Sequence, residues 1–152
     1  NMHGWHISGL RSPAIFENGQ KTGIAVENLK TREVRKLAVH ANKSGTQQEE
    51  PLHWTFDEQV LEWGNQVIKN SIPTDLLVVD EIGPLEMKWG RGWTNALEAL
   101  DSRLYRQAIL VMRPSLMNLA EERWQWGIKV LIEQVDQIEL LVEQLMREWK
   151  KP

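Results

Sequence analysis

The most constraining feature of the sequence is the segment from Leu76 to Glu81, in which four aliphatic residues are followed by two acids. A continuous aliphatic run is typical of a strand that is buried on both faces of a parallel sheet. Open parallel sheets bind ligands at the carboxyl ends of their strands, which is where Asp80 and Glu81 would emerge. The segment therefore predicts an α/β fold with an acidic site at one edge of the sheet.

The rest of the chain supplies the other elements of such a fold. Residues 5–40 form short apolar runs separated by turn formers, with a hairpin signal at Asn18-Gly19, and predict an antiparallel hairpin or meander. Residues 41–53 are polar and predict a solvated loop. Residues 54–150 form the α/β part that contains the acidic strand. In it we expect helices from Asp57 to before Pro73, at Trp93–Leu104, Asn118–Gly127 and Val135–Lys150, and strands at Asp75–Glu81, Ala108–Met112 and Lys129–Glu133.

Composition limits the classes of protein that remain. The chain has 152 residues, 41% of them hydrophobic, which suits a single α/β domain over residues 1–152. A net charge of -3 argues against nucleic acid as a partner, and the absence of cysteine excludes disulfides, thiolate metal sites and a cysteine nucleophile. The sequence shows neither an apolar run long enough for a membrane helix nor a signal peptide, so we expect a cytoplasmic protein with no membrane contact.

Aliphatic residues followed by two acids have the form of a Walker B strand. In that interpretation Asp80 holds the magnesium ion of a nucleotide through water, and Glu81 orients or deprotonates the attacking water. Acids after a strand also cap turns and helices, so this run alone leaves both interpretations open. The four histidines and the serines show no spacing typical of a metal site or of a nucleophile.

The residues around the two acids carry a family resemblance. The segment from Asp80 to Glu86 reads Asp-Glu-Ile-Gly-Pro-Leu-Glu and resembles the Asp-Glu-Ile-Gly-Pro-Met-Glu signature of the thermophile-type P-loop nucleoside triphosphatases. The segment Gly9–Ile24 is similar to that family's hairpin, and Ile109–Arg113 is similar to its strand ending in Val-His-Arg. The resemblance implies a P-loop fold that uses Mg²⁺ with a nucleoside triphosphate.

The chain also departs from the family pattern. Family members open with a strand, a Gly-x-x-x-x-Gly-Lys-Ser/Thr phosphate loop (Walker A) and a helix, and this sequence contains no such motif. Three charged or polar family positions are Ala14, Phe16 and Met112 here. We therefore expect a partial P-loop-like three-layer sandwich without its first strand and helix.

Three functions remain open. The first is a degenerate, non-catalytic or partner-dependent module. The second is a Mg²⁺-dependent hydrolase of nucleoside triphosphates whose phosphate loop lies on another chain or in a segment upstream of Met2. Without such a segment, we expect the natural chain to begin at Met2. The third is a structural or assembly protein that binds no nucleotide and needs no cofactor. In the first two, Arg11, Lys21, Arg91 and Arg113 are the cations to test as phosphate contacts, although an ordinary solvated surface is the favoured interpretation of each.

A missing first strand would affect the middle of the sheet. The strands Leu76–Asp80 and Ala108–Met112 must then either pair directly or offer an open edge to another chain. We expect either a homodimer or a separate subunit that bears the phosphate loop. Most of the eight tryptophans suit core positions, and Trp89 and Trp93 are the aromatics expected at such a contact.

Overall fold

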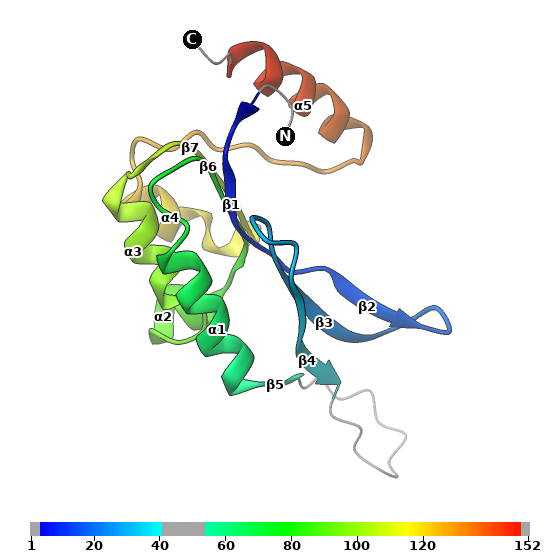
Figure 1. Ribbon diagram of the computed structural model, residues 1–152. Coiled ribbons are helices and arrows are strands. Elements are labelled where there is room, and N and C mark those ends of the chain that lie inside the picture. Colours follow the sequence, from blue (N-terminus) through cyan, green and yellow to red (C-terminus); the bar gives the residue numbers. More distant parts are fainter. Residues whose placement is uncertain (1–3, 41–53, 150–152) are drawn as a thin grey trace.

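The computed structural model describes residues 4–40 and 54–149, and its centre is one curled seven-stranded sheet (Figure 1). The expected polar loop at 41–53 lies outside the described residues. The strands are β1 (Ile7–Arg11), β2 (Ala14–Glu17), β3 (Gln20–Asn28), β4 (Val34–His40), β5 (Trp54–Phe56), β6 (Thr74–Ile82) and β7 (Tyr105–Met112). Their order is β5-β4-β3-β1-β6-β7, and β2 pairs with β3.

The strand with the two acids lies inside the parallel part of the sheet. β6 runs parallel to β1 on one side and to β7 on the other. Its Leu77 and Val79 are fully buried, whereas Asp80 is half-buried and Glu81 is exposed. The predicted mixed α/β fold with parallel core strands is therefore confirmed.

The pairing of β1 differs from the meander that its sequence predicts. β1 pairs antiparallel with β3 only at Leu10 and Arg11, and it is parallel to β6 over the four residues from Ile7 to Leu10. Gly9 makes this close approach feasible, because it has a φ of +117° and an added Cβ would lie 1.9 Å from the Val78 carbonyl oxygen. Turn signals show where a strand ends, but they do not show which neighbour it pairs with.

Direct pairing of β6 with β7 settles one of the alternatives raised by the sequence. The register runs from Thr74 opposite Tyr105 to Ile82 opposite Met112, with an irregularity between Asp80 and Ile82. In the described residues, these two strands thus close against each other with no strand between them.

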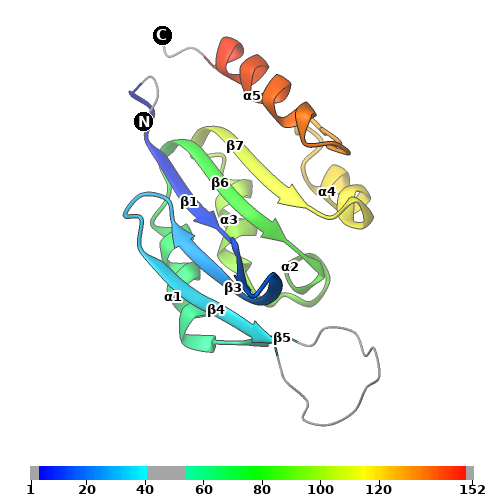
Figure 2. The same cartoon turned by 90° about the vertical axis from the view of Figure 1, so that its right-hand side faces the viewer.

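Four helices lie on one side of the sheet: α1 (Glu58–Lys69), α2 (Pro84–Trp89), α3 (Thr94–Ser102) and α4 (Met117–Arg123) (Figure 1). The helix α5 (Asp136–Glu148) lies apart from them and runs alongside β7 (Figure 2). Asp57 caps α1 as its position predicts, because its carboxylate accepts the N–H groups of Gln59 and Val60. Leu10, Ile68, Leu77 and Ile82 form the fully buried centre between this helical layer and the sheet.

The predicted strand at Lys129–Glu133 is wrong. The structure has no regular strand there, and the chain runs exposed from α4 to α5. Alternating and aliphatic residues favour a strand. A strand must also form hydrogen bonds with a neighbouring strand, and whether one is available depends on the tertiary structure. Conversely, the sequence interpretation missed β5 and α2, which are only three and six residues long.

The described residues include no helix that is both long and apolar enough to span a bilayer.

Candidate functional site

Asp80 is held in place by Ser12, the residue that follows β1. The Ser12 N–H donates to Asp80 Oδ2 at 3.0 Å, and the Ser12 hydroxyl donates to the Asp80 carbonyl oxygen at 2.6 Å. Since β1 and β6 are parallel, both end at the same edge of the sheet, and the two bonds fix the Asp80 carboxylate there. Its second oxygen, Oδ1, is the one left to bind a ligand.

Glu81 is the outermost acid of the pair. Its Oε1 accepts a hydrogen bond from Nε of Arg113 at 3.1 Å, and the two side chains are 48% and 67% exposed. Arg113 directly follows β7, so the two parallel strands bring these residues together from a separation of 32 positions. The predicted catalytic acid and one predicted phosphate contact therefore lie side by side at this edge.

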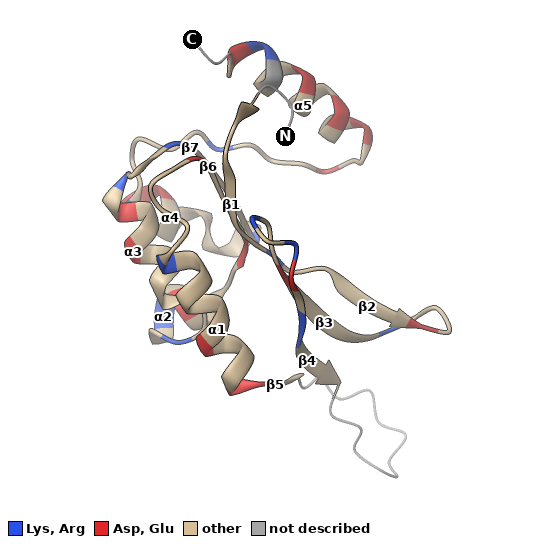
Figure 3. Cartoon of the chain, viewed as in Figure 1, with Lys and Arg blue, Asp and Glu red and all other residues tan. Residues whose placement is uncertain are grey.

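The other predicted phosphate contacts have different neighbours. Arg11 pairs at 2.7 Å with Glu27, a carboxylate that is only 5% exposed and that also pairs with Arg32 at 3.0 Å. This triad lies near the turn between β3 and β4, where charges of both signs adjoin in Figure 3. Lys21 lies 5.2 Å from the ring of Trp54. Arg91 is exposed in the loop after α2.

A buried carboxylate fixes the loop that follows the acidic pair. Glu86 is 6% exposed, and its two oxygens accept the N–H groups of Gly83 and Trp93, each at 2.8 Å. This closes the chain from the start of α2 to the start of α3. Trp93 is only 4% exposed and packs against Gly64, so its expected place at a contact surface is wrong, whereas Trp89 is 65% exposed.

The chemistry of the acidic edge fits a magnesium ion that is shared with phosphates. Asp80 and Glu81 offer carboxylate oxygens, the ligands that Mg²⁺ prefers, and Mg²⁺ in nucleotide sites takes one or two carboxylates together with phosphate oxygens and water. In the part of the chain that the structure describes, there is no group of three or more histidine, cysteine or acidic residues that could hold a metal ion without such help. Asp80 is the residue that would hold the ion.

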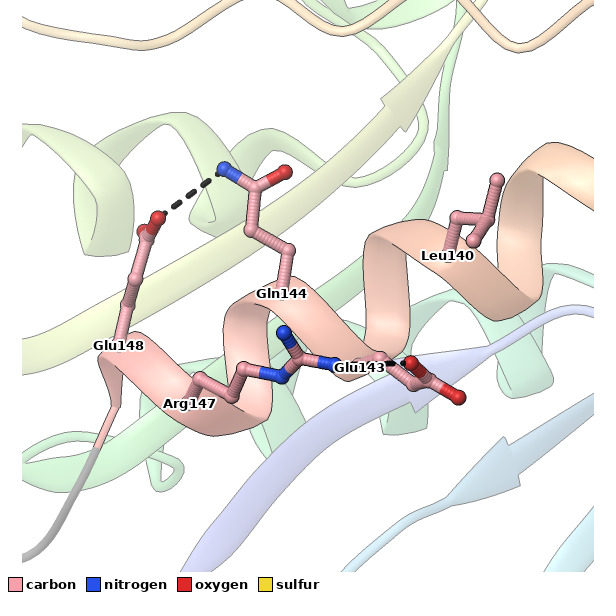
Figure 4. A pocket seen from close by; sticks show the side chains of 5 residues that line it. All are labelled: Leu140, Glu143, Gln144, Arg147 and Glu148. Atoms are coloured by element: carbon pink, nitrogen blue, oxygen red, sulfur yellow. Dashed lines mark hydrogen bonds and ion pairs between the residues drawn. The ribbon is translucent and has the colours of Figure 1, made fainter.

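Two further polar features lie away from this edge. Asp101 accepts hydrogen bonds from Arg123 and from the indole N–H of Trp124, and the Arg123 hydrogen bond is the main cause that lowers the pKa of this carboxyl. Figure 4 shows a shallow hollow whose lining residues all come from α5. Side chains of this one helix line the hollow, some of them paired with each other, and neither Asp80 nor Glu81 is among the lining residues.

Sequence reasoning found the two acids and missed the residues that position them. Ser12 lies two residues after the apolar run that ends at Leu10, and nothing in the sequence links its hydroxyl to Asp80. Glu86 belongs to the signature segment, but no pattern shows that its side chain returns to the N–H groups of two loop residues. Glu27 looks like any acid in a strand, and only tertiary structure places two arginines against it.

An acidic pair at the carboxyl edge of a parallel sheet, fixed by the end of the neighbouring strand, is an arrangement typical of nucleoside-triphosphatase-like α/β proteins. The sequence profile of the family described as NTPase matches residues 1–142, and the chain belongs to this family.

Two relatives agree with this assignment. The chain is 28% identical over 129 residues to a nucleoside-triphosphatase THEP1 of Methanosarcina acetivorans, a match that covers 84% of this chain and 70% of the relative. It is 30% identical over 115 residues to the protein of the same name from Caldivirga maquilingensis, covering 76% of this chain but only 64% of that relative, which is less than two thirds.

Two solved structures share the fold. One is the solution structure of a human cancer-related nucleoside triphosphatase, with a TM-score of 0.64 and 16% identity over 96% of this chain and 83% of that one. The other is the crystal structure of THEP1 from Aquifex aeolicus, with a TM-score of 0.61 and 13% identity over 96% and 85% of the two chains. At these identities the similarity concerns the fold alone.

Proposed function

We propose that the chain supplies the magnesium- and water-binding half of a nucleoside-triphosphatase site and depends on a phosphate loop from outside these 152 residues for turnover. The observation that carries the proposal is the fixed position of Asp80 and Glu81 at the carboxyl edge of β6 in a chain of the NTPase family. Asp80 would hold the ion, and Glu81 would orient or deprotonate the attacking water.

Electrostatics supports dependence on a partner. Triphosphate hydrolysis depends on positioning and on neutralising charge, and a phosphate loop supplies N–H groups and a lysine for both purposes. Among the described residues, the cation that pairs with this acidic edge is Arg113, whereas Arg11 is bound to Glu27 and Lys21 contacts Trp54. The acidic edge alone would therefore repel a triphosphate more than it attracts one.

The ion supplies Lewis-acid neutralisation of the phosphates when it is bound. The chain's own residues have simpler tasks. Ser12 keeps the Asp80 carboxylate in one orientation, and Arg113 keeps the Glu81 carboxylate beside it. On binding of a triphosphate, the Arg113 guanidinium can exchange Glu81 for a phosphate oxygen, which would release Glu81 to accept a proton from water.

Calorimetry and phosphate release test the proposal. We expect no saturable binding of MgATP or MgGTP up to millimolar concentration by the chain alone. We expect turnover once a polypeptide with a strand, a Gly-x-x-x-x-Gly-Lys-Ser loop and a helix is added or fused. Glu81→Gln should abolish that turnover, and Glu98→Gln, at an exposed position on α3, should not. Turnover by the chain alone that is lost on Glu81→Gln would instead establish an autonomous hydrolase.

A further inference from the structure

Two acids are buried among the described residues, Glu27 and Glu86, and they are paired in different ways. Glu86 accepts two backbone N–H groups, whose positions are fixed by the chain. The Glu27 side chain is only 5% exposed and pairs instead with Arg11 and Arg32, whose side chains are 55% and 69% exposed. A buried carboxylate needs such partners to stay charged, but an exposed guanidinium can also turn toward another anion. Glu27 therefore holds two cations that stay accessible to a ligand.

The register of the sheet places Arg11 between Glu27 and Asp80. Arg11 lies opposite Glu27 of β3. On its other side, β1 has Leu10 opposite Val79 of β6. The next position along these two parallel strands sets Arg11 beside Asp80. Leu10 and Val79 are buried in the core, and side chains alternate between the two faces of a strand, so the charged pair that follows lies on the face away from α1–α4 (Figure 1).

That face of the sheet is open on both sides of Arg11. Val111 of β7 lies opposite Asp80 and is 46% exposed. Val34 of β4 lies opposite Glu27 and is 58% exposed. A phosphate group bound at Asp80 can therefore reach the Arg11 guanidinium from this face.

Arg11 and Arg113 occupy corresponding places on the two sides of β6. Arg113 directly follows β7, and Arg11 is the last residue of β1. Each of them pairs with an acid, but the Glu81 side chain is 48% exposed and the Glu27 side chain only 5%. An ion at Asp80 would thus have one guanidinium on each side. This arrangement suits a phosphate chain, because cations on both sides neutralise the charge of a phosphoryl group during transfer.

Glu27 can release Arg11 and still keep a charged partner. Its Oε2 is 2.7 Å from Nη2 of Arg11, and its Oε1 is 3.0 Å from Nε of Arg32. Each carboxylate oxygen thus has its own guanidinium. When Arg11 turns to a phosphate, Arg32 still pairs with the buried carboxylate, so the cost of an unpaired buried charge is avoided. A buried carboxylate with one partner would not have this freedom.

We propose that Arg11 is a phosphate contact of the nucleotide site at Asp80. Glu27 retains Arg11 until the phosphate group arrives, and Arg32 keeps Glu27 paired after the exchange. The inference rests on the proposed function, because it names a further contact of the same site. It also gives a reason why the chain alone should bind no triphosphate, since Arg11 is then bound to Glu27.

Calorimetric titration of inorganic pyrophosphate with Mg²⁺ tests the inference on the chain alone. The wild type should show no saturable binding up to millimolar concentration. Glu27→Gln frees Arg11 and should bind with a dissociation constant at least about tenfold below that limit. Glu33→Gln is the matched control, because it removes the same charge and frees Arg35, which pairs with Glu33 at 2.7 Å and lies over the ring of Trp63. It should bind no better than the wild type.

Two double variants distinguish Arg11 from its neighbour. In the Glu27→Gln background, Arg11→Gln and Arg32→Gln remove the same charge, yet only Arg11→Gln should abolish the gain in affinity. The gain should also require Mg²⁺, because without the ion the carboxylates of Asp80 and Glu81 repel pyrophosphate. Equal losses from the two arginine variants, or an equal gain without Mg²⁺, would overturn the inference.

Glu27→Asp keeps the charge and provides a second variant in case Glu27→Gln does not fold. Its carboxylate is one methylene shorter and cannot hold both guanidiniums, so it should give a gain of about threefold. No gain from either Glu27 variant would overturn the inference. Turnover with an added phosphate loop tests the proposed function separately. Turnover that depends on Glu81, together with no gain from the Glu27 variants, would remove the role of Arg11 and leave the proposed function in place.

Discussion

Two regions of this protein use similar apolar residues in opposite ways: the body, which we define as residues 4–40 and 54–124, and the arm, residues 125–149. In the body, aliphatic side chains such as Leu10, Leu77 and Ile82 are fully buried between the sheet and α1–α4. In the arm, Ile128, Val135 and Leu140 are at least 69% exposed. Sequence hydrophobicity alone therefore does not distinguish an apolar residue that is buried in this fold from one that stays exposed on its surface. Changes in the body should therefore lower the free energy of unfolding of the whole protein, whereas changes in the arm should affect local order only.

The largest effect is expected in the body at Gly9. Its φ of +117° disfavours any side chain, and a Cβ there would lie 1.9 Å from the Val78 carbonyl oxygen, a backbone atom that cannot move aside cheaply. Gly9→Ala should separate β1 from β6 and cost about 4 kcal/mol or more in free energy of unfolding. Chemical denaturation measures this loss.

Gly19→Ala is the control for Gly9, because Gly19 also has a positive φ, +78°, but no atom within 4 Å of its Cβ position. It should cost only about 1 kcal/mol. Equal losses from the two substitutions would show that the close pairing of β1 with β6 does not hold the body together.

The next effect is expected at Glu86, where both carboxylate oxygens are used inside the body. Glu86→Gln replaces one acceptor with an N–H₂ group, which leaves the N–H of Gly83 or of Trp93 facing a donor. The free energy of unfolding should fall by about 1 to 3 kcal/mol. Thermal and urea unfolding test this prediction. Glu98→Gln, at an exposed position, is the control and should leave both unfolding midpoints unchanged. An unchanged Glu86→Gln protein would mean that the loop from α2 to α3 is not fixed by this carboxylate.

A smaller, pH-dependent effect is expected where α4 is tied to α3. The hydrogen bond from Arg123 holds the pKa of Asp101 below its ordinary value of 3.8. A carboxyl with a lowered pKa in the folded state stabilises the protein fully above about pH 4, and this contribution is lost as the pH falls through the lowered pKa. Since both side chains are about two-fifths exposed, the contribution should stay below about 1 kcal/mol.

The measurement for this pair is the free energy of unfolding from pH 2 to pH 6. Asp101→Asn should be less stable than the wild type at pH 6, and the difference should shrink toward pH 2. Arg123→Gln removes the main cause of the pKa shift and should behave in the same way. A difference that is constant with pH would assign the effect to packing or to the Trp124 hydrogen bond.

The contrast between body and arm also explains how far the sequence could be interpreted. Aliphatic runs and helical spacing predicted β6, β7 and α1, because in these elements local pattern and tertiary packing agree. The position of Asp80 and Glu81 followed from the same strand. The pairing of β1 with β6 and the anchoring of Asp80 by Ser12 could not be predicted, because they join residues 68 or more positions apart. The predicted strand at Lys129–Glu133 failed for the corresponding reason: its pattern is correct for a strand, but β7 does not pair with it in this chain.

The smallest effect on overall stability is expected from a tryptophan of the arm, and a tryptophan of the body provides the comparison. Trp124 is 7% exposed within the core, so Trp124→Ala should cost about 3 to 5 kcal/mol. Trp149→Ala removes the stack on Trp5 at the end of α5 and should change the free energy of unfolding by less than about 0.5 kcal/mol. Hydrogen exchange should instead show that the amides of α5 lose protection by about tenfold, because α5 can unfold locally while the body stays folded. If Trp149→Ala destabilised the whole protein as much as Trp124→Ala, the arm would unfold together with the body, and the distinction between the two regions would be wrong.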